Sequence, residues 1–160
     1  MPKGAVTPAL AAIQHAQVDH RVHRYDHDPA NRSYGAEAAT ALGVELARVF
    51  KTLVVTVDGA MAVAVIPVDT QLDLKRFAAS HGGKRAAMAD PRDAERATGY
   101  VVGGISPFGQ KRTLPAALDE SATGFTTIFV SAGRRGLEIE LAPDDLVRMT
   151  GAITAPIARS

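Results

Sequence analysis

Two apolar segments joined by Asp58-Gly59 are the feature that most limits how this chain can fold. Residues 49–57 and 61–68 are dominated by valine and other apolar residues, and they are the strongest strand signals in the sequence. Asp-Gly between two such segments is a strong short-range signal for a tight turn, because it suits a two-residue hairpin loop. The sequence therefore predicts a β-hairpin at this point.

Capping residues and glycines divide the rest of the chain into short elements. Thr7-Pro8, Ser33 and Asp90-Pro91 mark helix starts, and glycines mark helix ends. The predicted helices span residues 8–17, 34–42, 72–81, 91–98 and 143–149, and the predicted further strands span 20–26, 86–88, 127–131 and 137–141. Residues 114–118 suit either a strand or a helix, and residues 152–160 carry no strong pattern. Hairpins mixed with helices favour a mixed α/β (α+β) fold with a largely antiparallel sheet over repeated βαβ units.

Composition limits the class of protein further. A chain of 160 residues with 46% hydrophobic and 22% charged residues suits one globular domain over residues 1–160 and excludes disorder as its main state. The absence of cysteine excludes disulfides, thiolate zinc sites and a cysteine nucleophile. No apolar stretch approaches the ~20 residues of a membrane helix, and no signal-peptide core is present, so we expect a cytoplasmic protein.

Lys51 stands out because it lies inside an apolar strand. Strand alternation places Lys51 on the same face as Val49, Leu53 and Val55. Burial lowers a lysine pKa, and a lysine in a pocket can serve as a point charge or a hydrogen-bond donor. The alternative is a lysine at a strand end whose ammonium group reaches solvent while its stem packs on apolar neighbours.

A glycine-rich segment, residues 99–112, is the second candidate site. Its four glycines and its proline impose a special backbone path, and glycines let backbone N–H groups approach an anionic ligand closely. Lys111 and Arg112 follow, where they could meet phosphate. The segment matches neither a Walker A loop nor a dinucleotide-binding loop. A structural turn with solvated charges is the alternative.

Three histidines, His20, His23 and His27, suggest a metal site at first sight. In a strand, however, His20 and His23 point to opposite faces, and no cysteine joins them. We therefore expect no metal and no other cofactor.

Basic pairs could form a surface for nucleic acid. The pairs Lys84-Arg85, Lys111-Arg112 and Arg134-Arg135 lie far apart in sequence and could converge on phosphate groups. A net charge of +1 permits a nucleic-acid partner without requiring one. No G-x-S-x-G or H-E-x-x-H motif is present, so the nucleophile of an enzymatic reaction would be water or part of the substrate.

These motifs, taken together, resemble the YbaK/EbsC family of aminoacyl-tRNA editing domains. The matching stretches run over most of the chain, from about Thr7 to Gly151: Tyr25-Asp26-His27-Asp28-Pro29, Val49-Phe50-Lys51-Thr52-Leu53, Met88-Ala89-Asp90, residues 98–107 with Gly109-Gln110-Lys111, Ile128-Phe129-Val130-Ser131, Arg135-Gly136-Leu137, and Ala142-Pro143 with Asp145-Leu146. The glycine-rich stretch followed by Gln-Lys is the specific part of this match.

The resemblance implies a curved, barrel-like, mainly antiparallel sheet flanked by helices. It also implies a trans-acting enzyme that deacylates mischarged Cys-tRNA(Pro), with Cys-tRNA(Cys) as a further substrate, as a hydrolase or in a lyase-like reaction. The resemblance further implies that the substrate's own thiol attacks its ester carbonyl. The implied partners are the 3′ end of mischarged tRNA and prolyl-tRNA synthetase, with no membrane.

The resemblance also assigns site residues. The family's essential lysine falls on Lys51, and its backbone-donating glycine falls on Gly103 beside Gly104. Substrate-binding positions fall on Tyr25, Ser131 and Glu138, and Lys111 and Arg112 are expected to contact phosphate. The chain departs from the family at Ala132, where relatives usually carry glycine, and Glu138 can be aspartate in relatives.

Two alternatives stay open. A deacylase of the same fold could clear alanine, serine or threonine, because pocket volume sets the choice among small amino acids and the sequence does not reveal it. A non-catalytic module that binds tRNA ends or a synthetase is the other alternative. The sequence makes no prediction of the oligomeric state.

Overall fold

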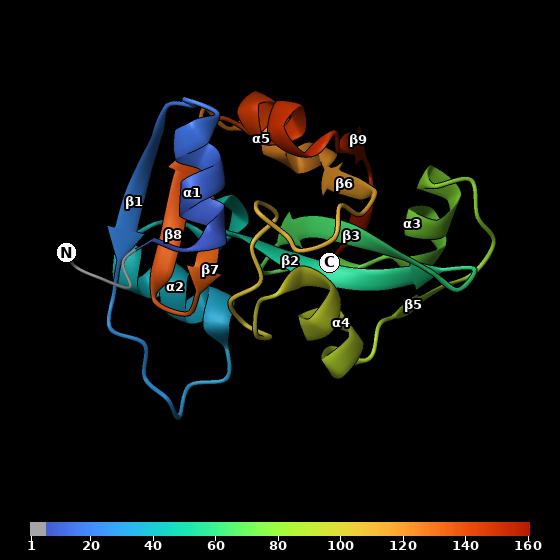
Figure 1. Cartoon of the computed structure of the whole chain (residues 1–160), viewed down its shortest axis with the longest axis horizontal. Coiled ribbons are helices and arrows are strands. Elements are labelled where there is room, and N and C mark those ends of the chain that lie inside the picture. The colour runs from blue at the N-terminus through green and yellow to red at the C-terminus, as the bar shows by residue number, and fades with distance from the viewer. Residues whose placement is uncertain (1–5) are drawn as a thin grey trace.

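The computed structural model describes residues 6–160, which form short helices packed on three β-sheets (Figure 1). The helices are α1 (Pro8–His15), α2 (Tyr34–Leu42), α3 (Leu74–Ser80), α4 (Pro91–Thr98) and α5 (Pro143–Thr150), with 3₁₀ turns at Leu46–Arg48 and Glu120–Gly124. The strands are β1 (His20–Arg24), β2 (Phe50–Val57), β3 (Ala60–Pro67), β4 (Gln71–Leu72), β5 (Ala86–Met88), β6 (Ala116–Asp119), β7 (Ile128–Arg134), β8 (Leu137–Leu141), β9 (Ile153–Ala155) and β10 (Ala158–Arg159). No helix among the described residues is long and apolar enough to cross a membrane.

The predicted hairpin is confirmed as β2 and β3. The two strands pair antiparallel over their full length, from Phe50 opposite Pro67 to Val57 opposite Ala60. Asp58 and Gly59 have φ angles of 49° and 88°, the left-handed values that a two-residue turn of this kind requires at both positions.

A five-stranded sheet of order β5-β2-β3-β6-β9 surrounds this hairpin. Its β2–β3 and β2–β5 pairs are antiparallel, whereas β6 and β9 run parallel to their neighbours. The ambiguous segment 114–118 thus contributes a strand. The tail, which had no pattern, forms β9 and β10, because the carboxylate of Asp119 accepts hydrogen bonds from the N–H groups of Ile157 at 3.0 Å and Ala158 at 2.9 Å. Such long-range contacts leave no local signature.

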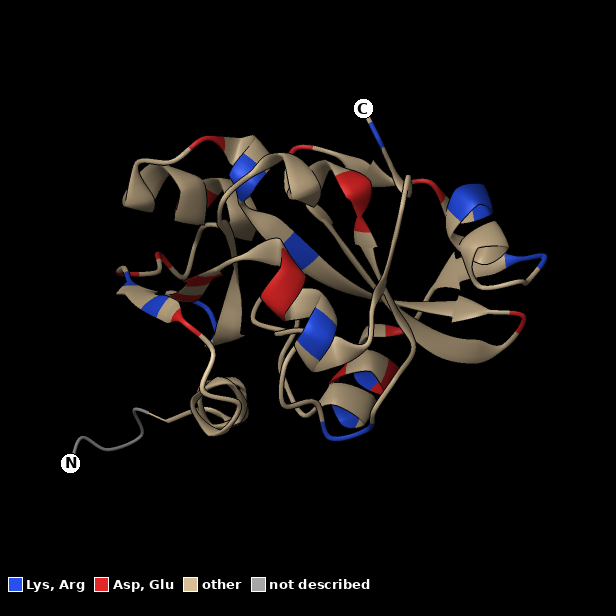
Figure 2. Cartoon of the chain, turned by 90° about the horizontal axis from the view of Figure 1, so that it is seen from above, with Lys and Arg blue, Asp and Glu red and all other residues tan. Residues whose placement is uncertain are grey.

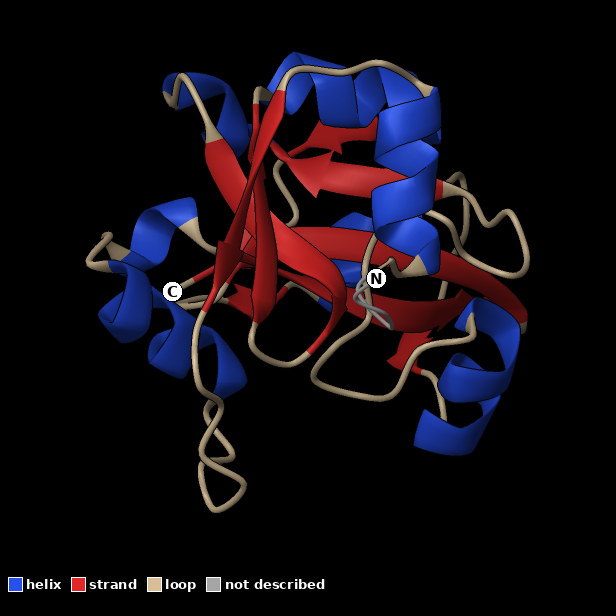
Figure 3. Ribbon diagram, turned by 60° about the vertical axis from the view of Figure 1, so that its left-hand side comes forward, coloured by secondary structure: helices blue, strands red, loops and turns tan. Residues whose placement is uncertain are grey.

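A three-stranded antiparallel sheet of order β1-β8-β7 lies beside it (Figure 3). The two sheets meet at a parallel bridge between Val49 and Phe129. The mixed α+β class is confirmed, and the ladder of paired strands does not close into a barrel within residues 6–160.

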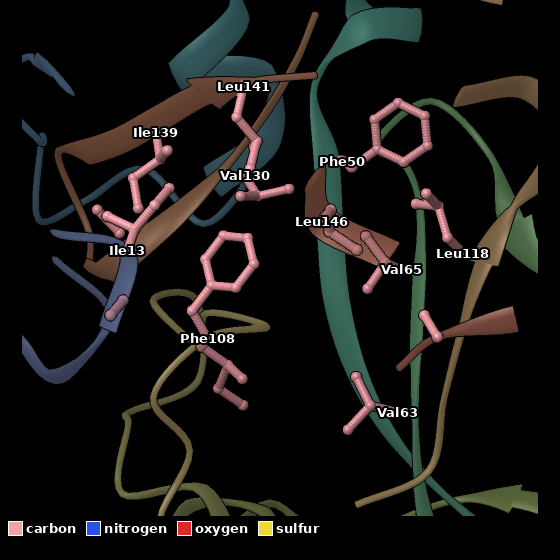
Figure 4. Close-up of a cluster of buried hydrophobic side chains, with 14 of the residues drawn as sticks. Ile13, Phe50, Val63, Val65, Phe108, Leu118, Val130, Ile139, Leu141 and Leu146 are labelled. Carbon is pink, nitrogen blue, oxygen red and sulfur yellow. The ribbon is translucent and has the colours of Figure 1, made fainter. Parts of the chain in front are cut away.

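The main hydrophobic core lies between the two sheets. Side chains of α1, β7 and β8 face those of β2 and β3, with Phe108 of the glycine-rich segment among them (Figure 4). A second cluster on the opposite face of β2 and β3 includes Phe77 of α3 and Ile157. A third, smaller cluster joins α2 to Val49 and Phe129. The junction of the sheets is therefore packed on several sides.

Some predicted boundaries are wrong, for local reasons. The helix predicted from residue 72 begins at Leu74, because Asp73 caps it by accepting from the Arg76 N–H at 3.0 Å and Leu72 pairs with Ala158. Thr7 and Asp90 cap their helices as predicted. Ser33 does not cap α2 with its side chain; its own N–H donates to Asn31 Oδ1 at 2.8 Å in the preceding turn.

Candidate functional site

A cavity of about 510 Å³ opens where the two sheets meet. Its walls come from the start of β2, from α2, from the N-terminal half of α4, from the glycine-rich segment and from the strands β7 and β8. Five of the residues assigned by resemblance line it: Tyr25, Lys51, Gly103, Ser131 and Glu138. The fold thus brings these residues together from five separate segments of the chain.

The first half of β2 reaches this cavity with an open edge. β5 pairs only with residues 55–57 of β2, and the last contact on that side is the Ala89 N–H donating to the Val54 C=O at 3.0 Å. Backbone groups of a strand alternate between its two edges, so the N–H and C=O of Thr52 point toward the same edge as those of Val54. All four residues from Phe50 to Leu53 line the cavity.

Lys51 lies half-buried at the cavity wall. Its Nζ donates to the Thr70 C=O at 3.0 Å. Burial lowers the pKa of Lys51, while the nearby carboxylate of Asp69 acts in the opposite direction. An ammonium group has three donors, so the bond to Thr70 leaves two N–H groups for a substrate.

Glu138 is the most deeply buried acid of the site. It is 7% exposed, and burial raises its pKa to about 8. Tyr25 lies close by: burial, together with the charge of Glu138, raises the pKa of the Tyr25 hydroxyl to about 12. Both groups are therefore largely uncharged near neutral pH in the empty cavity.

Ser131 holds the glycine-rich segment in place. Its hydroxyl donates to the Gly104 C=O at 2.9 Å and accepts from the Gly133 N–H at 3.1 Å. The Gly104 N–H donates to the Val101 C=O at 2.9 Å, and Gly104 is not among the residues that line the cavity. Of the two adjacent glycines, only Gly103 lines the cavity.

Tyr34 lines the cavity and Arg135 stacks on its ring, a contact that the sequence did not predict, since Arg135 was expected only as part of a basic pair that meets phosphate. The Arg135 guanidinium lies 4.4 Å from the ring centroid of Tyr34 and donates to the Val102 C=O at 2.5 Å. Gly103 has a φ of 90°, and a Cβ there would lie 2.7 Å from both Arg135 Nε and the Tyr34 ring. The dipeptide Arg135-Gly136 within the family motif was the available signal, but its contact with Tyr34 requires the fold.

Two further lining residues, Thr52 and Arg32, were not predicted as site residues. Thr52 is buried, and its hydroxyl has no hydrogen-bond partner. A threonine directly after Lys51 in an apolar strand was the signal that could have singled it out. Arg32 is exposed at the cavity and places a cation there.

Lys111 and Arg112 lie away from the cavity. Both are exposed, and their N–H groups donate to the carbonyls of Thr98 and Ala97 at the C-terminal end of α4, whereas Pro91 at the other end lines the cavity. Eight helical residues separate these ends, or about 12 Å at 1.5 Å per residue. Basic and acidic segments are spread over the whole molecule (Figure 2).

The three histidines bond to different partners. His20 Nδ1 lies 2.7 Å from the Val18 C=O, His23 Nε2 lies 2.9 Å from Glu140 Oε1, and His27 Nδ1 lies 2.6 Å from Glu37 Oε1. No group of three or more His, Asp or Glu side chains within residues 6–160 is arranged to hold a metal ion.

Comparison with known proteins identifies the family to which this chain is similar. The family model of the aminoacyl-tRNA editing domain matches residues 28–149. A protein of Enterococcus faecalis, described as a candidate Cys-tRNA(Pro)/Cys-tRNA(Cys) deacylase, EbsC, is 39% identical over 94% of this chain and 92% of its own length. The Multifunctional Ser/Thr-tRNA deacylase ProXp-y of Escherichia coli is 30% identical over 93% of this chain and 91% of its own.

A solved structure extends the comparison to the fold. It is described as a candidate trans-editing enzyme for prolyl-tRNA synthetase, and it superposes with a TM-score of 0.81 at 26% identity. The alignment covers 98% of this chain and 100% of that chain.

Proposed function

This chain belongs to the family of aminoacyl-tRNA editing domains, and we propose that it is a trans-acting deacylase that removes cysteine from mischarged tRNA(Pro), and also from tRNA(Cys). The observation that carries the proposal is the cavity at the open edge of β2, where Lys51 and Gly103 meet Tyr25, Ser131 and Glu138. Its volume of about 510 Å³ suits an amino acid with part of the terminal adenosine, within the usual range for small-molecule sites.

Lys51 supplies the positive charge in this proposal. Its two remaining N–H donors would hold the ester or the adjoining phosphate group while the Thr70 carbonyl fixes the ammonium in place. Partial burial strengthens the interaction of such a charge with an anion, because the local dielectric constant is lower than that of water. Lys51 thereby orients the ester through hydrogen bonds and forms no covalent bond to it.

Gly103 supplies the backbone donor. Its N–H belongs to a segment held by Arg135 and, through Gly104, by Ser131. A fixed donor aimed at the carbonyl oxygen stabilises the negative charge that develops there in the transition state, typically by about 3–4 kcal/mol. Gly104 serves by its lack of a side chain, since a Cβ would lie 2.8 Å from the backbone of Arg134.

The substrate supplies the nucleophile. The cysteine sulfur attacks the ester carbonyl carbon, the C–O bond to the ribose breaks, and the thiol proton passes to the ribose oxygen. The amino acid leaves as a four-membered thiolactone, which water then opens. Placement of thiol and carbonyl in one cavity raises their effective concentration, so the chain needs no nucleophile of its own.

Single-turnover cleavage of tRNA(Pro) charged with cysteine or with S-methylcysteine tests this mechanism. The methylated ester fits a similar volume but has no free thiol, and we expect it to be cleaved at least about 100-fold more slowly. Competition between the two esters controls for binding. Equal rates at equal affinity would rule out thiol attack and favour water.

A second candidate substrate is a seryl or threonyl ester. The similarity to ProXp-y supports it, and the free hydroxyl of Thr52 could bond to a substrate hydroxyl. Here water would be the nucleophile. The same assay over Cys-, Ser-, Thr-, Ala- and Pro-tRNA(Pro) separates the candidates, and the cysteine proposal predicts the highest rate for the cysteinyl ester.

Prolyl-tRNA synthetase is the protein partner we propose. The similarity to the solved trans-editing enzyme supports it, and a net charge of +1 provides little electrostatic attraction for a tRNA body. Adding the synthetase should lower the KM for Cys-tRNA(Pro). An unchanged KM would contradict this part of the proposal.

A further inference from the structure

Two buried polar atoms without partners face the same cavity. Glu138 is 7% exposed and Thr52 is 9% exposed; Glu138 Oε1 and Thr52 Oγ1 have no hydrogen-bond partner, and both residues line the cavity. A buried polar atom without a hydrogen-bond partner destabilises the folded state. Polar groups without hydrogen-bond partners in an empty cavity indicate that a ligand supplies the missing partners.

The missing partner of Glu138 is a cation. Burial accounts for the raised pKa of Glu138, and no positive charge of the protein offsets it. None of the neighbouring cations bonds to Glu138. Lys51 donates to the Thr70 carbonyl, Arg135 donates through Nη2 to the Val102 carbonyl and stacks on the Tyr34 ring while its Nε has no partner, and Arg32 is exposed at the cavity. His23, which pairs with Glu138 across the strands, bonds to Glu140 instead.

The open edge of β2 adds a third acceptor. The C=O of Thr52 points toward the same edge as that of Val54, beyond the last residue that β5 covers. The cavity thus offers a carboxylate, a hydroxyl and a carbonyl. An alkylammonium group has three N–H donors and no acceptor, so its donors match these acceptors in number. Its positive charge favours the ionised form of Glu138, which is largely protonated in the empty cavity.

We propose that Glu138 and Thr52 form the subsite for the α-ammonium group of the aminoacyl ester, and that this subsite restricts the enzyme to esters with a free amino group. The proposal rests on the function proposed above and names a requirement of the substrate. Acylation of the amino group removes the charge and two donors, and it adds bulk. Peptidyl and N-formylated aminoacyl esters would therefore be excluded, while every free aminoacyl ester would retain this anchor.

Cleavage of cysteinyl-tRNA(Pro) and of its N-acetyl derivative tests the proposal. Both esters keep the thiol, so thiol attack is possible in each. Each rate is divided by the spontaneous hydrolysis rate of the same ester, which removes the intrinsic effect of acetylation. For the wild-type protein we expect the corrected single-turnover rate of the N-acetyl ester to be at least about 30-fold lower, as a lost charge-assisted hydrogen bond is worth about 2 kcal/mol.

Glu138→Gln should lower cleavage of the free-amino ester at least about 10-fold and reduce the ratio of the free-amino rate to the N-acetyl rate. Glu140→Gln is the matched control, because Glu140 lies two residues further along the same strand but outside the cavity. This control should keep the full preference for the free-amino ester. Equal corrected rates of the two esters with the wild-type protein, or an undiminished preference in Glu138→Gln, would overturn the proposal.

A binding measurement separates this proposal from the proposed function. 3′-Deoxy-3′-(alanylamino)adenosine carries an amide in place of the ester and does not react, so its affinity reports on the subsite alone. By calorimetry we expect it to bind at least 10-fold more tightly than its N-acetyl form, and Glu138→Gln and Thr52→Val should each reduce this ratio. A wild-type protein that cleaves no ester but shows this ratio would contradict the deacylase and support the subsite; cleavage without the ratio would do the reverse.

Discussion

The two halves of β2 differ in what surrounds them. Residues 54–57 pair with β3 on one edge and meet β5 on the other, and Val55 is completely buried. Residues 50–53 pair with β3 alone, and their second edge opens into the cavity. The same strand thus pairs on both edges at one end and lines the cavity with Lys51 and Thr52 at the other.

This difference arises from the way the two sheets meet. β7 approaches the chain at the Val49–Phe129 bridge, while β5 begins its pairing with Val55 opposite Met88. Neither strand pairs with residues 50–53, which lie between these points. An edge left open inside a protein keeps its backbone groups available, which would be a liability on an exposed surface. Here the cavity walls enclose it.

Replacing Lys51 should have the largest effect on deacylation, and it should distinguish the open half of β2 from the paired half. We expect Lys51→Ala to lower single-turnover deacylation at least about 100-fold, or about 2.7 kcal/mol, because the cation that orients the ester is lost. Its thermal midpoint should change little, since the side chain is half-buried and the backbone pairing with β3 is kept.

Val55→Ala is the reciprocal variant in the paired half. Removing two buried methyl groups should cost about 2 kcal/mol, which lowers the thermal midpoint by about 4–8 °C, while the rate at a temperature where the protein is folded stays near that of the wild type. Loss of activity in Val55→Ala without loss of stability, or full activity of Lys51→Ala, would break the comparison.

Charge reversal at Lys111 and Arg112 tests whether recognition extends beyond the open half of β2. We expect the double variant to bind tRNA about 10-fold more weakly and to show a slope of log affinity against log salt that is smaller by one to two, because each lost phosphate contact retains counterions. Cleavage of cysteinyl-adenosine, which has no tRNA body, should be unchanged. An unchanged slope would indicate that the protein recognises tRNA through the cavity alone.

Glu138 should make the stability of the protein depend on pH. Its pKa is about 8 in the folded protein and near 4.5 in the unfolded chain, so the folded state holds more protons between these values. The free energy of unfolding should therefore fall as pH rises from 4.5 to 8, by an amount on the order of a few kcal/mol. The thermal midpoint should drop between pH 5 and pH 8.5 in the wild type and clearly less in Glu138→Gln; parallel curves would contradict the raised pKa.

Thr52→Val should have the smallest effect on stability. The Thr52 hydroxyl has no partner, so replacing it by a methyl group of the same shape should change the free energy of unfolding by less than about 1 kcal/mol, or increase it. Thr98 is the matched control, because its buried hydroxyl donates to the Ala94 C=O at 2.8 Å and accepts from the Tyr100 N–H at 3.2 Å. Thr98→Val should cost about 1–3 kcal/mol by chemical denaturation.

Local signals in the sequence predict most elements correctly. The helix Tyr34–Leu42, the strand Ala86–Met88 and the helix Pro91–Thr98 have the predicted bounds. Proline and glycine at the helix ends, together with apolar runs, act within a few residues, so a single segment carries enough information. The parallel pairs of β6 and β9 and the strands of the tail depend on partners far away in the chain.

The site divides in the same way. The resemblance to the family assigned Tyr25, Lys51, Gly103, Ser131 and Glu138 to the site, and all five line one cavity. The same motifs also suggested Gly104, Lys111 and Arg112, whose side chains or positions lie outside its walls. Membership in a motif therefore selected residues near the site without separating those that face the cavity from those that shape the surrounding chain.

The sequence by itself determined the hairpin, the capped helices and the chemical groups that the site can use, because these follow from residue type and short-range spacing. Only the tertiary structure decided which groups meet. The burial of Glu138, the free hydroxyl of Thr52, the stacking of Arg135 on Tyr34 and the open edge of β2 all arise where segments distant in the sequence pack together. Desolvation and unsatisfied hydrogen bonds are properties of that packing, and no single segment contains them.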